Sequence, residues 1–153
     1  MRSVNHLNPL SAILFGAALL IAFTGCGDGR GNRIPVAGSV TIDGEPLKFG
    51  SVTFMPKTHG DGMRAGGGSV DGQGRFTVSS FTANDGLLIG SYEVQIKAVE
   101  KIDSSSQRWH APRKYSKVKT SNLKAEITAD TTELKFELSW DGEDPSEPFV
   151  ETF

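Results

Sequence analysis

Apolar and polar residues alternate with a period of two through most of the chain after residue 34. The clearest run covers residues 90–98, where the apolar positions are Tyr92, Val94, Ile96 and Ala98. Successive side chains of a β-strand point to opposite faces, so this pattern predicts a half-buried strand. Similar runs predict six further strands, at 36–42, around 52–54, 69–70, 75–78, 123–129 and 134–140.

Glycine-rich and polar segments separate these runs. Asp43-Gly44, the segment 71–74 and the segment 130–132 are turn signals, because glycine and aspartate tolerate the backbone angles that tight turns require. We expect loops at 57–68 and 82–86, and a long excursion without periodicity at 100–121.

About seven short strands, with no helical pattern among them, predict an all-β fold. We expect one antiparallel β-sandwich domain over residues 34–140, in which each sheet has one buried and one solvated face. An up-and-down barrel is the alternative way to close such strands.

The N-terminal 25 residues have the parts of a signal peptide. Arg2 precedes an apolar run at residues 10–23, which small residues follow. The run is shorter than the roughly 20 residues needed to span a bilayer, so a retained transmembrane helix is the poorer interpretation.

Cys26 is the only cysteine of the chain and directly follows Thr24-Gly25. This placement resembles a bacterial lipobox, although Phe23 replaces the usual leucine three positions before the cysteine. The resemblance implies cleavage between Gly25 and Cys26 and acylation of Cys26, for example with palmitate. The alternative is a secreted chain that is cut nearby and keeps an unmodified thiol.

A lipoprotein carries two or three acyl chains, which together hold it durably at a membrane. Residues 26–33 are rich in glycine and predict a flexible tether between the anchor and the domain. We therefore expect an extracytoplasmic protein of the bacterial cell envelope whose acylated Cys26 contacts membrane lipid. The formal net charge of −2 argues against a nucleic-acid partner.

The C-terminal segment 141–153 holds five acidic residues and no Lys or Arg. Such a composition cannot bury enough apolar surface to fold by itself, so we expect a disordered acidic tail.

Several motifs together resemble carboxypeptidase regulatory-like domains, as found in planctomycete-type envelope lipoproteins. They are the opening segments 36–47 and 50–56, the turn 71–76, the strand 90–94 and the segment 112–116. The resemblance covers roughly residues 34–140 and implies a transthyretin-like (prealbumin-like) β-sandwich that acts as an accessory module without chemistry of its own.

No pattern in the sequence predicts a catalytic residue, a cofactor site or a metal site. His59 and His110 lie on separate loops, whereas a metal site needs clustered ligands. No serine lies in a Gly-x-Ser-x-Gly motif, and the Asp-Gly turns lack the ligand ladder of a calcium loop. A transthyretin-like hydrolase is the enzyme alternative, but the chain lacks that enzyme's C-terminal Tyr-Arg-Gly-Ser.

The excursion at 100–121 is rich in cations and contains the candidate contact residues Trp109, Arg113, Lys114 and Tyr115. They predict a surface for an anionic polymer or lipid. The alternative is a solvated loop that the acidic tail partly neutralises.

Two functions follow from this pattern. The chain is either a non-catalytic binding or structural module that contacts envelope polysaccharide or protein through its loops, or an accessory subunit that meets a larger envelope assembly through a sheet edge.

Overall fold

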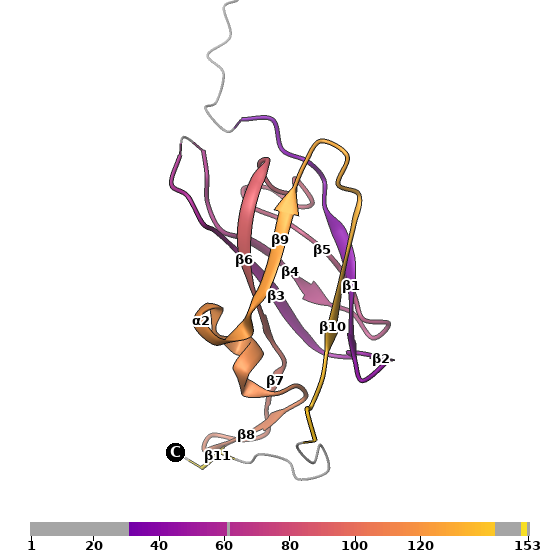
Figure 1. The fold of residues 1–153 in the computed structure, drawn as a ribbon. Helices are drawn as coiled ribbons and strands as arrows, with labels where there is room; N and C mark the ends of the chain where they lie inside the picture. Colours follow the sequence, from indigo (N-terminus) through magenta and orange to yellow (C-terminus); the bar gives the residue numbers. More distant parts are fainter. Residues whose placement is uncertain (1–30, 61, 143–150, 153) are drawn as a thin grey trace, which may run out of the picture.

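The computed structural model describes residues 31–60, 62–142 and 151–152. The predicted signal peptide, its cleavage site at Gly25 and Cys26, and most of the predicted tether lie outside these residues. The described chain is an all-β sandwich, as the alternation predicts (Figure 1).

Two sheets form the sandwich. In the first, β1 (Ala37–Ile42) lies between β10 (Glu133–Leu138) on one side and both β2 (Glu45–Pro46) and β5 (Arg75–Thr77) on the other. The second sheet has the order β4 (Gly66–Val70), β3 (Gly50–Pro56), β6 (Gly90–Lys97) and β9 (Leu123–Ile127).

The pairing of β1 with β10 is parallel, with Val40 opposite Phe136, which differs from the purely antiparallel arrangement that we expected. Antiparallel pairing follows naturally when a short turn joins two strands. No such turn joins β1 and β10, because the rest of the domain lies between them in the sequence. Their relative direction is therefore free of that constraint.

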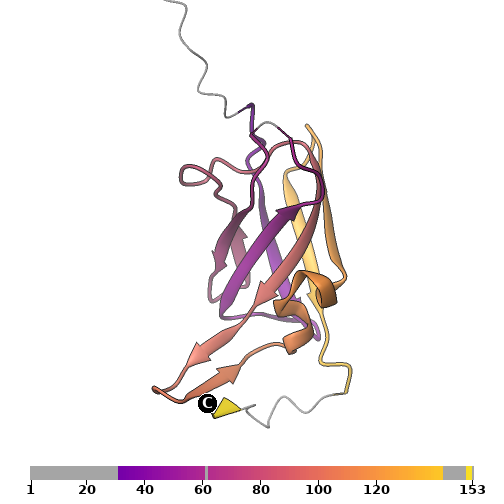
Figure 2. The ribbon, with the colours of Figure 1, turned by 90° about the vertical axis from the view of Figure 1, so that its left-hand side faces the viewer.

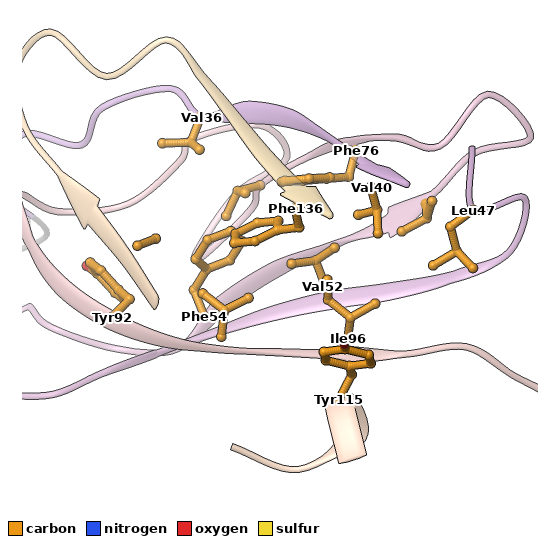
Figure 3. Close-up of a cluster of buried hydrophobic side chains, with 14 of the residues drawn as sticks. Val36, Val40, Leu47, Val52, Phe54, Phe76, Tyr92, Ile96, Tyr115 and Phe136 are labelled. Carbon is orange, nitrogen blue, oxygen red and sulfur yellow. The ribbon is translucent and has the colours of Figure 1, made fainter. Parts of the chain in front are cut away.

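The alternating apolar residues form the core between the sheets (Figure 3). Phe54, Phe76 and Phe136 come from three strands, and their ring centroids lie 6.1 Å apart in each pair. Each buried side chain of this size stabilises the fold by about 1.5–3 kcal/mol relative to exposure. Most apolar residues of the predicted strands are buried. The strand predicted at 123–129 ends at Ile127, and Ala129 is exposed in the turn that follows.

Gly66–Val70 is a strand, so the loop predicted at 57–68 is shorter than expected. The backbones of Gly67 and Ser79 exchange two hydrogen bonds of 2.9 Å. A Cβ on Gly68 would lie 2.0 Å from the carbonyl oxygen of Thr77. The glycines are therefore strand residues that allow two backbones to pack closely.

The excursion at 100–121 is structured. Its first part is a hairpin of β7 (Val99–Lys101) and β8 (Ser106–Trp109), which extends beyond the sandwich (Figure 2). A 3-10 helix, Arg113–Ser116, and the helical turn α2 (Val118–Ser121) follow.

Part of the segment predicted as a disordered tail also pairs with this hairpin. Glu151–Thr152 form β11, antiparallel to β8. Strand pairing uses backbone groups, so a segment rich in acidic residues can still add to an exposed strand edge.

Candidate functional site

A surface groove of about 470 Å³ lies where β6 ends and β8, the 3-10 helix and α2 meet. It contains three of the four contact residues predicted from the sequence, Trp109, Arg113 and Lys114. The other lining residues are Lys97, Gln107, Ser116, Lys117 and Thr120.

Local sequence features fix the helical wall of this groove. Pro112 directly precedes the 3-10 helix. The N–H of a residue at this position forms no hydrogen bond within the helix, so proline, which lacks an N–H, is tolerated there. The buried hydroxyl of Ser121 donates a 2.5 Å hydrogen bond to the carbonyl of Val94 and so fastens α2 to β6. Asn122 adopts the left-handed conformation that ends α2 and starts β9.

Trp109 and Arg113 form one side of the groove. The guanidinium carbon of Arg113 lies 5.3 Å from the Trp109 ring centroid, within the range of a cation–π contact. Contact with the half-buried indole therefore restrains the side chain of Arg113. The indole Nε1 is buried and has no hydrogen-bond acceptor among the residues that the structure describes.

Lys114 makes two contacts beside the groove. Its ammonium donates a hydrogen bond to the carboxylate of Asp141 and lies 4.8 Å from the Tyr115 ring centroid. The hydrogen bond to Asp141 raises the pKa of Lys114, and the same bond lowers the pKa of Asp141. The start of the acidic segment thus neutralises one of the groove's cations.

Tyr115 does not line the groove, which corrects its prediction as a contact residue. Its side chain is only 8% exposed and belongs to the core (Figure 3). The Ser139 N–H donates a 3.2 Å hydrogen bond to the Tyr115 hydroxyl, which also lies 3.5 Å from the Ser139 carbonyl. Tyr115 therefore joins the 3-10 helix to the end of β10. Alternation could not reveal this burial, because the residue lies in a short 3-10 helix.

Cations predominate among the described residues that line the groove. They are Lys97, Arg113, Lys114 and Lys117, and no carboxylate is among the lining residues that the structure describes. Of these, Lys97 and Lys117 form no ion pair with any residue in the described ranges. Two neighbouring lysines of this kind create a local positive potential that attracts anions. Sequence reasoning missed Lys97 because it lies on a core strand, before the cationic segment.

A larger hollow, of about 690 Å³, lies over the other sheet and has mixed charge. Arg75 lines it, but so do Asp71 and Glu133, and the Asp71 carboxylate lies 3.2 Å from Arg75 Nε. These opposite charges make it a weaker candidate than the groove beside Trp109.

A second feature missed in the sequence is a cluster at the start of the domain. Arg33, predicted to end the tether, is held by the fold: it donates a 3.0 Å hydrogen bond to the Gly62 carbonyl. The guanidinium carbons of Arg33 and Arg64 lie 4.5 and 4.4 Å from the Phe81 ring centroid. We interpret this cluster as structural.

Neither histidine takes part in a metal-like cluster. His110 lies 3.0 Å from Glu100, and among the described residues no three His, Cys, Asp or Glu side chains are placed to share an ion. No helix in the described part of the chain has the length and apolar character needed to cross a membrane.

Comparisons with protein-family models, curated proteins and solved structures found no match to this chain. The resemblance to carboxypeptidase regulatory-like domains therefore remains a prediction from its motifs.

Proposed function

We propose that the chain is a membrane-anchored extracytoplasmic lipoprotein whose β-sandwich is a non-catalytic binding or structural module of the cell envelope. The signal-like N-terminus and the position of Cys26 support the anchor. The motifs that resemble carboxypeptidase regulatory-like domains support an accessory role for the sandwich.

The structural observation that best supports this function is the position of the groove. The chain enters the domain at one end of the sandwich, whereas β8 and α2, which border the groove, lie toward the opposite end (Figures 1 and 2). Four residues, 27–30, lie between Cys26 and the described chain, so Cys26 lies at most about 18 Å from Gly31 when this segment is extended. A lipid-anchored chain would therefore hold its first end near the membrane and present the groove away from it.

An accessory subunit is the second candidate. Among the described strands, β9 pairs only with β6, so its other edge is open to a further strand. Lys124 and Glu126 are exposed on β9, and charged side chains of this kind commonly discourage uncontrolled strand addition.

Membrane fractionation tests the anchor. In a bacterial host that processes lipoproteins, we expect the wild-type chain to incorporate labelled palmitate and to stay with membranes after a high-salt wash. The Cys26→Ala chain should lose the label and most of its membrane association, whereas the surface variant Ser104→Ala should behave as wild type. Salt-resistant membrane binding of Cys26→Ala would show that acylation is not the anchor.

Affinity purification from detergent-solubilised membranes separates the two candidate roles. Recovery of a partner protein in stoichiometric amount would favour the accessory subunit. Retention of the purified chain on isolated cell-wall polysaccharide, with no other protein present, would favour the binding module.

A further inference from the structure

We propose that the end of the sandwich at which the chain enters docks onto a phospholipid surface through the exposed side chains of Ile89 and Phe81. This inference rests on the proposed lipid anchor and goes beyond it, because an anchor alone limits only the distance of this end from the membrane. Ile89 is 57% exposed and Phe81 is 40% exposed. Both residues lie between β5 and β6, and Figure 1 shows that β6 begins at the end where the chain enters.

The chain enters the domain directly beside Ile89. A Cβ on Gly31, the first described residue, would lie 2.8 Å from Cδ2 of Leu88. The backbones of Ile34 and Leu87 then exchange two hydrogen bonds, of 2.7 and 3.0 Å. The entering segment therefore runs along residues 87–88, and the exposed Ile89 follows immediately.

This position would bring Ile89 close to lipid. An acylated Cys26 at the headgroups would hold Gly31 within about 18 Å of them, because only residues 27–30 lie between the two. So short a tether gives this end of the domain a high effective concentration at the lipid surface. A weak apolar contact that would not form from free solution is then populated.

Phe81 supplies the second apolar contact, from an ordered loop. The Asp85 carboxylate accepts three backbone N–H bonds and so fixes the loop at 79–86. The guanidinium carbons of Arg33 and Arg64 lie 4.5 and 4.4 Å from the Phe81 ring centroid, and Arg64 is itself exposed. An aromatic ring beside a guanidinium suits the boundary of a membrane, where the ring meets acyl chains and the cation meets phosphate oxygens.

The proposal depends on apolar contact and not on net charge, since exposed residues of both signs, Lys57 and Asp130, follow β3 and β9 toward this end. Single exposed apolar residues are common on soluble domains, so the test needs a matched residue elsewhere. Ile102 is 47% exposed and directly follows β7, in the hairpin at the opposite end (Figures 1 and 2). Ile102→Ser therefore removes the same kind of side chain from an end that docking would point away from the membrane.

The experiment uses the full acylated chain, reconstituted into phosphatidylcholine vesicles that contain phosphatidylglycerol. Cys26 is the only cysteine and acylation blocks its thiol, so one introduced cysteine takes an environment-sensitive fluorophore. Ala83→Cys places the fluorophore in the exposed loop at 79–86, and Ser104→Cys places it in the hairpin. Nitroxide-labelled lipids then report contact, because they quench only a fluorophore that reaches them.

We expect strong quenching at position 83 and little at position 104. Ile89→Ser should lower the docking equilibrium measured at position 83 roughly three- to tenfold, the effect of withdrawing one partly buried apolar side chain from lipid. Ile102→Ser should leave it unchanged. Both isoleucines are exposed, so circular dichroism should show both serine variants folded.

Equal quenching at the two positions, or quenching at position 83 that Ile89→Ser does not reduce, would overturn the proposal. Flotation of the same samples reports the anchor separately. A chain that floats with the vesicles but does not respond to Ile89→Ser keeps its anchor and loses the docking surface. A chain that is not acylated and does not float would overturn both proposals.

Discussion

Arg33 Nε lies 3.5 Å from Asp85 Oδ2, and the two side chains are only 7% and 16% exposed. The same carboxylate accepts hydrogen bonds from the backbone N–H groups of Ser80, Phe81 and Thr82. One aspartate thus closes the 79–86 loop and holds the residue at which the chain enters the domain. Any flexible tether to Cys26 must therefore end before Arg33.

We expect Asp85→Ala to destabilise the domain by about 2 kcal/mol, because three backbone N–H groups lose a charged acceptor and the Arg33 guanidinium loses its ion-pair partner. Urea unfolding at neutral pH measures this change. Asp130→Ala is the control, since Asp130 is exposed in the turn before β10. If the two variants lose equal stability, Asp85 does not organise the loop as described.

The stability of the domain should fall in acid. Burial acts to raise the pKa of Asp85, but the three N–H groups and Arg33 outweigh it and lower that pKa below its ordinary value of 3.8. The Arg75 N–H lowers the pKa of Asp71, and the Ser106 hydroxyl lowers that of Asp103.

A lowered folded-state pKa means that these carboxylates stabilise the fold fully above about pH 4 and lose their contribution as the pH falls through the folded-state values. Thermal unfolding between pH 7 and pH 2 should show this decline. Asp85→Asn should be less stable at neutral pH and should show a shallower decline, whereas an unchanged slope would contradict the role of Asp85.

The sandwich could be predicted because its core strands have one buried and one solvated face. Tyr92, Val94 and Ile96 alternate in the sequence and are all buried in the structure. The β7–β8 hairpin could not be predicted in this way, since it extends beyond the core and most of its residues are polar. The parallel pairing of β1 with β10 depends on the whole topology and leaves no local signal.

The groove was only partly predictable for a similar reason. The cationic composition of residues 108–119 indicated the region, and Trp109, Arg113 and Lys114 do line one groove. Lys97 comes from a distant strand, and Tyr115 is withdrawn into the core, so neither role follows from local sequence. Both depend on how the 3-10 helix packs against β6 and β10.

Gly68→Ala should destabilise the domain by about 1–3 kcal/mol, the usual cost of overpacking. A methyl group at Gly68 would meet the Thr77 carbonyl oxygen at 2.0 Å and would force β4 away from β5. Gly72→Ala is the matched control, because its Cβ would have no neighbour within 4 Å. Urea unfolding of both variants measures the difference. Equal stabilities would mean that the two strands are less closely packed than the structure indicates.

Tyr115→Phe tests the structural role of the Tyr115 hydroxyl. The substitution keeps the buried ring but removes the hydroxyl that accepts the Ser139 N–H. We expect a loss of about 1 kcal/mol in the free energy of unfolding, the usual contribution of one such hydrogen bond. Urea unfolding measures this change, and an unchanged stability would mean that the hydroxyl does not hold the 3-10 helix to the end of β10.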